Sequence, residues 1–205
     1  MQPKDEGYIK FNIDWIQTDP YELFLGQKYL QILDDLIDYR QKLYGRNWIG
    51  TYPDGIGFGN ISRRFEGNTF IISGSATGKA SVVTQDHFSK VFAFDILKNK
   101  VVCKGAVKAS SESLSHAIIY QTLADVNVVL HIHDEKLWLK SLNKYPTTHV
   151  NVPYGTPRMA NEIERLLLEK DWNNQPHIII MAGHEEGIIA FGNNMEEAFV
   201  HLDNI

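Results

Sequence analysis

The segment from residue 126 to residue 133 constrains the fold of this chain more than any other. An apolar run, Val126 to Leu130, leads directly into His131-Ile132-His133, which predicts a strand over residues 127–133. Because alternate residues of a strand face the same side, His131 and His133 would present both imidazoles to one face of a sheet. Two imidazoles on one face are candidate ligands for a divalent metal ion. A short motif of this kind needs support from the rest of the sequence.

The composition is that of an ordinary globular protein. With 205 residues, of which 43% are hydrophobic and 22% charged, the chain is long enough for one sizeable α/β domain. The net charge of −5, without any basic stripe, argues against a nucleic-acid partner. The single cysteine, Cys103, excludes an internal disulfide and is expected to be a buried strand residue rather than a nucleophile. We find no signal-peptide pattern and no membrane-spanning run, so we expect a cytoplasmic protein with no membrane partner.

Hydrophobic periodicity predicts several helices and short strands. Helical spacing covers residues 21–44, 113–123, 157–170 and 195–202, and β patterns cover residues 9–16, 69–73, 91–95, 100–104, 127–133, 177–181 and 187–192. Strand pairs that read as hairpins, with helices between them, favour a single-domain layered α/β fold with a central, largely antiparallel sheet flanked by helices. We expect residues 1–25 to form an N-terminal extension and residues 26–205 to form the domain.

Three short polar segments are candidate anion-binding loops. The segment Gly74 to Lys79 is not a P-loop, because its glycines are one residue too close and Ala80 replaces the hydroxyl residue that binds magnesium. Its backbone N–H groups and hydroxyls could still bind a phosphate, as could those of the loops at Asn60-Ile61-Ser62 and Ser110-Ser111. Taken singly, each loop is also explained as a turn or a helix cap.

Further candidates for chemistry lie around the His-x-His strand. Glu112 is either a first-turn carboxylate favoured by the helix dipole or a proton donor and acceptor beside a metal. His184 follows an apolar strand and is the best candidate for a third metal ligand, whereas His116 is expected to have a structural role. The remaining histidines are interpreted as surface or packing residues: His87, His149, His177 and His201.

These segments, in their order along the chain, resemble the class II aldolase/adducin family. That family includes fuculose-phosphate and rhamnulose-phosphate aldolases and ribulose-phosphate 4-epimerase. The resemblance covers about residues 28–200 and depends on the following segments: Gly59 to Ser62, Ser73 to Gly78, Ser110-Ser111-Glu112, Asp125 to His133, Gly155-Thr156, and His184 before Gly187 to Ala190.

The resemblance implies a metal-dependent lyase that cleaves a small ketose phosphate by retro-aldol chemistry. It implies Zn²⁺ or another divalent metal on His131, His133 and His184, stabilising an enediolate while Glu112 shuttles the proton. It also implies a binding site for the substrate phosphate made of the following residues: Asn60, Thr77, Gly78, Ser110 and Ser111. Family enzymes place their sites between subunits of a tetramer, so a homo-oligomer is expected.

The sequence departs from the family pattern in ways that leave alternatives open. Glu185-Glu186 separates His184 from Gly187, so either His184 or a neighbouring glutamate completes the metal site. The sequence ends at Ile205, whereas the family enzymes continue into a tail that supplies an aromatic acid/base group, and we expect the N-terminal residues to pack in its place. The alternatives are a sugar-phosphate epimerase or dehydratase and a non-catalytic, adducin-like interaction domain. Family epimerases carry Asp at the position of Glu112, which favours cleavage or dehydration.

Overall fold

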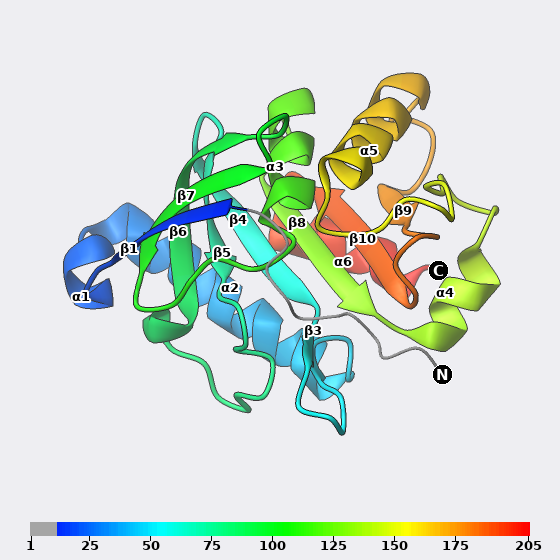
Figure 1. The fold of residues 1–205 in the computed structure, drawn as a ribbon. Coiled ribbons are helices and arrows are strands. Elements are labelled where there is room, and N and C mark those ends of the chain that lie inside the picture. The colour runs from blue at the N-terminus through cyan, green and yellow to red at the C-terminus, as the bar shows by residue number, and fades with distance from the viewer. Residues whose placement is uncertain (1–11) are drawn as a thin grey trace.

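One large sheet with helices on both faces forms the body of the protein (Figure 1). The computed structural model describes residues 12–205. The eight strands of this sheet lie in the order β1-β7-β6-β5-β4-β8-β10-β9. Their bounds are β1 Asn12–Gln17, β4 Asn60–Glu66, β5 Thr69–Ser73, β6 Phe88–Asp95, β7 Lys100–Gly105, β8 Val128–His133, β9 Ile178–Ile180 and β10 Gly187–Gly192. Every neighbouring pair is antiparallel except β1–β7, so the predicted, largely antiparallel α/β sheet is confirmed.

The helices form a layer on each face of the sheet. Their bounds are α1 Pro20–Leu23, α2 Gln27–Gly45, α3 Ser113–Thr122, α4 Glu135–Ser141, α5 Pro157–Glu169 and α6 Met195–Asp203. One core contains α3 and α5, and the other contains α2 and α6. Strand side chains alternate between them, so that Val129 packs in the first core while Val128 and Leu130 pack in the second. His131 and His133 therefore face the side of α3 and α5.

The structure corrects several boundaries that periodicity alone predicted. The helix expected over residues 21–44 is divided into α1 and α2 at Gly26, because its φ of 102° lies outside the helical region. Asn60 is expected in a loop but begins β4, a central strand whose first three residues are all buried, so that no alternation of apolar and polar residues marks it in the sequence. Helix α4 and a small hairpin of β2 Gly50–Thr51 and β3 Gly57–Phe58 were not predicted.

The N-terminal segment extends the main sheet. Residues 12–17 pair with β7 in parallel as the edge strand β1, which agrees with the β pattern predicted over residues 9–16. The rest of that prediction, and the packing expected for the first residues of the chain, lie outside the described residues. An N-terminal extension ending at residue 25 stays a prediction.

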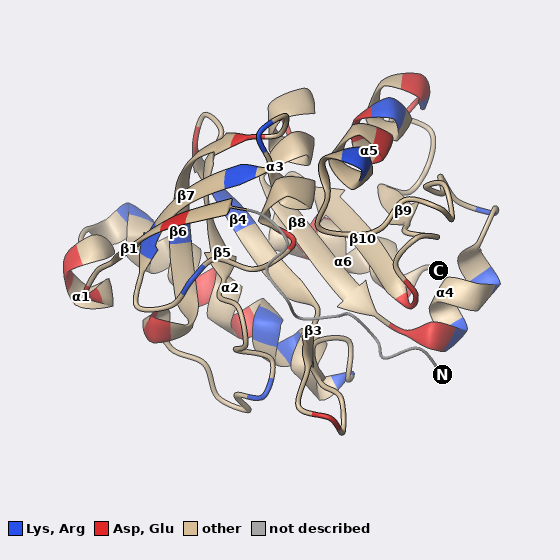
Figure 2. Ribbon diagram, in the orientation of Figure 1, with Lys and Arg blue, Asp and Glu red and all other residues tan. Residues whose placement is uncertain are grey.

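Charges of both signs are interspersed along the helices (Figure 2). On α5, for example, Arg165 pairs with Glu162 at 3.0 Å and with Glu169 at 2.7 Å. Cys103 is fully buried in β7, and burial raises the pKa of its thiol, in keeping with the packing role expected. Within residues 12–205, no helix is both long and apolar enough to cross a membrane.

Candidate metal centre and anion pocket

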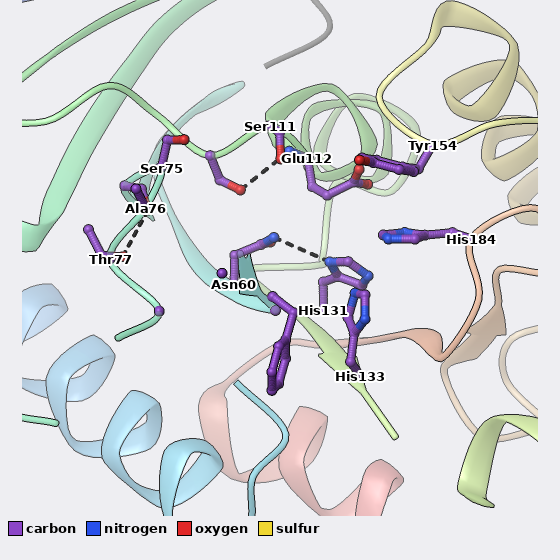
Figure 3. Close-up of a pocket in the computed structure, with 16 residues that line it drawn as sticks. Asn60, Ser75, Ala76, Thr77, Ser111, Glu112, His131, His133, Tyr154 and His184 are labelled. Atoms are coloured by element: carbon purple, nitrogen blue, oxygen red, sulfur yellow. Dashed lines mark hydrogen bonds between the residues drawn. The ribbon is translucent and has the colours of Figure 1, made fainter. Parts of the chain in front are cut away.

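One pocket collects all the site residues predicted from the sequence (Figure 3). It lies where the start of β4, the loop after β5, the segment before α3, the end of β8 and the turn before β10 come together. Its lining includes Asn60, Thr77, Gly78, Ser110, Ser111, Glu112, His131, His133 and His184. Segments as far apart in sequence as residues 60 and 184 thus meet at one end of the sheet.

His131, His133 and His184, here called the pocket cluster, lie on one side of the pocket (Figure 3). The first two are successive same-face residues of β8, while Ile132 between them packs in the opposite core. Ring centroids are 4.9 Å apart for His131 and His133, 5.0 Å for His131 and His184, and 4.7 Å for His133 and His184. One nitrogen from each ring lies within 4.8 Å of the others, so a single ion could contact all three.

His184 reaches this position from a tight turn between β9 and β10. Its N–H donates to Met181 O at 3.0 Å, and its own carbonyl accepts from Gly187 N at 2.9 Å. At Gly183 a Cβ would lie 1.9 Å from Val152 O, so only glycine permits this close approach of the two backbones. The Tyr154 ring stacks on the imidazole of His184 with centroids 4.1 Å apart.

Of the two neighbouring glutamates, Glu186 lies near the pocket cluster. Tyr52 Oη donates to Glu186 Oε2 at 2.5 Å and lies 2.9 Å from His133 Nδ1. The carboxylate itself is 3.8 Å from the same His133 nitrogen. Glu186 and Tyr52 are therefore placed to orient the imidazole of His133 from its Nδ1 side, while Glu185 is exposed.

The environment of His131 favours a neutral imidazole. Its pKa is held well below the usual value, first by burial and then by the nearby charges of His133 and His184. His131 Nε2 is buried and, within residues 12–205, accepts or donates no hydrogen bond, whereas its Nδ1 lies 3.2 Å from Asn60 Nδ2. A divalent metal binds imidazole in its neutral form, and three imidazole ligands leave one coordination position open. The residues present thus fit a zinc-type ion.

Glu112 is buried beside the pocket cluster at the N-terminal end of α3. Its side chain is 2% exposed, and its Oε2 accepts a hydrogen bond from Ser115 Oγ at 2.7 Å. The nearby His116 faces away from the pocket, where its Nδ1 lies 2.7 Å from Ser62 Oγ in the core. Burial lowers the pKa of His116 to about 3, so this residue is a neutral packing group, as expected from the sequence.

The loop that carries Thr77 and Gly78 is held from behind by a residue that the sequence analysis missed. Arg40 is 1% exposed, and its Nη2 donates to Thr77 O at 3.1 Å and to Gly78 O at 3.0 Å. Thr77 Oγ1 donates to Gly74 O at 2.8 Å. A signal was present: Arg40 lies on the apolar stripe of its helix, in register with Leu36 and Leu43.

The serine pair lies just before α3, whose N-terminus opens on the pocket. Ser110 Oγ accepts from Glu112 N at 3.3 Å, while Ser113 Oγ donates to Ser110 O at 2.7 Å. Ser110 thus makes the turn contacts expected of a helix start, and Ser111 lines the pocket beside it. A helix N-terminus carries partial positive charge and suits an anion. Tyr52, Phe58 and Tyr154 were missed, because single aromatic residues give no pattern in sequence.

The sequence matches the Class II Aldolase and Adducin N-terminal domain family over residues 34–205. The chain therefore belongs to this family, which confirms the resemblance found from its motifs. No curated protein sequence matches it significantly.

Solved structures share the fold at low sequence identity. An L-fuculose 1-phosphate aldolase superposes with a TM-score of 0.62 at 21% identity, covering 84% of this chain and 80% of the other. A sugar-phosphate aldolase from Thermotoga maritima gives 0.63 at 12% identity, with 87% and 91% covered. An L-fuculose 1-phosphate aldolase from Glaciozyma antarctica PI12 gives 0.60 at 14% identity, with 88% and 73% covered. At these identities the likeness establishes the shared fold.

Proposed function

We propose that the protein is a divalent-metal-dependent aldehyde-lyase that cleaves a small ketose phosphate by a retro-aldol reaction. The observation that carries the proposal is the buried pocket cluster of three imidazoles beside the buried carboxylate of Glu112. A bound Zn²⁺ would act there as a Lewis acid toward the hydroxyl and carbonyl oxygens of the substrate. The names of two similar structures, fuculose 1-phosphate aldolase and sugar-phosphate aldolase, agree with this substrate class.

In this proposal Glu112 moves the proton. Retro-aldol cleavage removes a proton from a hydroxyl group, breaks the adjacent C–C bond and returns a proton to the carbon of the ketone half. The donated hydrogen bond of Ser115 fixes the orientation of the Glu112 carboxylate, and burial excludes water that would compete for the proton. The products would be dihydroxyacetone phosphate and an aldehyde.

The substrate phosphate is assigned to the other side of the pocket. The N-terminus of α3 with Ser110 and Ser111 and the Thr77-Gly78 loop offer N–H and hydroxyl groups there. Asn60, whose Nδ2 lies 3.2 Å from His131 Nδ1, adds an amide group on the side of the histidines. Arg40 adds a permanent positive charge behind Thr77 and Gly78 and fixes the direction of their peptide groups. A phosphate held here would lie across the pocket from the histidines (Figure 3).

The alternatives from the sequence use the same residues. Epimerisation or dehydration would need the same metal and proton shuttle, and the presence of Glu112 in place of Asp favours cleavage or dehydration. A non-catalytic, adducin-like role gives no reason for three convergent imidazoles and a buried carboxylate. A homotetramer and a cytoplasmic location remain predictions.

Metal analysis with a cleavage assay tests the proposal. When the protein is expressed with added zinc, the His131→Ala variant is expected to contain one equivalent of metal less than wild type. The control is His149→Ala, which alters an exposed histidine. Release of dihydroxyacetone phosphate from a panel of ketose 1-phosphates is measured by coupled NADH oxidation. A metal content that His131→Ala leaves unchanged would refute the pocket metal, and turnover without any C–C cleavage would indicate the epimerase or dehydratase alternative.

A further inference from the structure

A second cluster of metal-ligating side chains lies at the edge of the sheet, away from the residues that line the pocket. It consists of His177, Glu197 and His201, here called the edge cluster. His177 immediately precedes the edge strand β9, whereas Glu197 and His201 are four residues apart and share one face of α6. From the sequence, both histidines are interpreted as surface or packing residues, because their neighbours in space are distant along the chain.

The three ligand atoms converge on one point. His177 Nδ1 is 3.7 Å and His201 Nε2 is 3.9 Å from the same oxygen, Glu197 Oε1, and the two imidazole centroids are 4.8 Å apart. These separations are too long for hydrogen bonds. Ligands bonded to a tetrahedral zinc at about 2.0–2.2 Å lie about 3.3–3.5 Å from one another, so small side-chain rotations would bring the edge cluster around one ion.

Two of the three side chains of the edge cluster already have a hydrogen-bond partner on the atom that does not face the cluster, which leaves their other atoms for a metal ion. His177 Nε2 lies 2.8 Å from Trp172 O and can only donate to it, so the neutral ring carries its lone pair on Nδ1. Glu197 Oε2 accepts from Asn193 N at 3.1 Å. Within residues 12–205, no hydrogen bond reaches His177 Nδ1 or His201 Nε2, although both atoms are buried. Fixed outer contacts of this kind are typical of metal ligands.

Aromatic packing further fixes the first of these ligands. The ring of His177 stacks on Phe191 with centroids 5.2 Å apart and an interplanar angle of 14°, and Trp172 meets it edge-on at 6.1 Å. The side chains of His177, Glu197 and His201 are 23%, 37% and 22% exposed, which lets an ion enter from solvent.

We propose that the edge cluster is a second metal site, which binds Zn²⁺ or a similar transition-metal ion and pins α6 to the edge of the sheet. Two imidazoles and one carboxylate suit zinc or cobalt, whereas calcium and magnesium prefer oxygen ligands alone. The site is independent of the proposed function, because it shares no residue with the pocket cluster. Its expected role is to stabilise the C-terminal helix.

Metal titration of the full-length protein tests this proposal. Wild-type protein, stripped with chelator and titrated with Zn²⁺ by calorimetry, is expected to bind two equivalents. His201→Ala and Glu197→Gln should each weaken one of them by more than about 100-fold, since even outer contacts of metal ligands contribute 10–100-fold. Co²⁺ should give a visible absorption band in His131→Ala protein that disappears when His201→Ala is added. Zn²⁺ should raise the Tm of His131→Ala but not of the double variant.

The controls separate this proposal from the proposed function. Glu197→Gln keeps the size and helix propensity of the side chain, and circular dichroism of the metal-free variants checks that they fold. His149→Ala should bind as wild type. If His201→Ala removes an equivalent and His131→Ala does not, the pocket metal fails while the edge site stands. If His201→Ala and Glu197→Gln both bind Zn²⁺ with the same stoichiometry and affinities as wild type, the edge site is overturned.

Discussion

The pocket cluster and the edge cluster each bring three metal-ligating side chains together, but in different surroundings. The pocket cluster is buried, consists of imidazoles alone and has the carboxylate of Glu112 beside it. The edge cluster is partly exposed and includes its own carboxylate, Glu197, as a ligand. In the pocket, ligands come from a central strand and a hairpin turn, while at the edge they come from the last helix and the chain before β9.

We infer from this difference that the position of a metal site in the fold decides whether its ion serves catalysis or stability. A metal held by three neutral imidazoles keeps its full positive charge and an open coordination position, which suits activation of a substrate. A carboxylate ligand neutralises part of that charge, and an ion between α6 and the sheet edge joins two elements that each also pack elsewhere. We therefore expect changes near the pocket cluster to affect turnover and changes near the edge cluster to affect stability.

The largest effect is expected for Glu112→Gln. The amide keeps the size of the side chain but cannot move a proton, so kcat for cleavage should fall by about 10²–10⁴-fold. Metal content at both clusters should stay unchanged, because Glu112 belongs to neither. Glu185→Gln, an exposed change next to His184, is the matched control and should retain full turnover. Equal activity of the two variants would show that another group carries the proton.

A smaller effect, confined to the pocket cluster, is expected for Gly183→Ala. The new methyl group would lie 1.9 Å from Val152 O, so the turn that carries His184 must shift. We expect zinc affinity of the pocket cluster to fall by about 10–100-fold, as when the supporting contacts of a ligand are removed. The second equivalent, at the edge cluster, should bind unchanged. Gly45→Ala, at the end of α2, adds a methyl group without this clash and should leave both affinities intact. A parallel loss at both clusters would mean general destabilisation instead.

The sequence could predict the parts of the site that local geometry determines. His131 and His133 share a face because strand residues alternate, and Glu112 starts a helix, so these residues needed no tertiary information. His184 could be proposed as a third ligand, but only the close approach of Gly183 to Val152 explains how it reaches the others across Glu185-Glu186. The alternation of short strands and helices was likewise enough for the layered fold.

The features that the sequence could not predict depend on contacts between distant elements. Arg40 supports the Thr77-Gly78 loop from a helix that precedes it by more than thirty residues. The edge cluster joins His177 to α6, and nothing local to either segment distinguishes its histidines from surface ones. Helix α2 also begins later than the apolar periodicity predicts, because the backbone conformation of Gly26 is incompatible with a helix.

The histidines of the interior should also dominate the pH dependence of stability. Burial lowers the pKa of His116 from 6.5 to about 3 in the folded state. Between these values the unfolded chain binds more protons than the folded one, so stability is full above pH 6.5 and falls as the pH decreases. At pH 5 the expected loss from this residue is about 2 kcal/mol relative to pH 8. Urea unfolding of His116→Gln should show a shallower pH dependence, whereas His149→Gln, which alters an exposed histidine, should stay close to wild type. Identical slopes for His116→Gln and wild type would contradict this assignment.

The smallest effect tests the support of the edge cluster alone. Asn194 caps α6, since its side chain accepts a hydrogen bond from Glu197 N at 2.9 Å. Asn194→Ala should cost about 1 kcal/mol of stability in urea, because the cap is lost. It should also weaken Zn²⁺ binding at the edge cluster several-fold, since the first turn of α6 carries Glu197. Thr156→Ala removes the equivalent cap of α5 and should cost a similar amount of stability without changing either zinc affinity. If both variants weaken the same zinc equivalent alike, the loss reflects overall stability, and α6 has no special part in holding that ion.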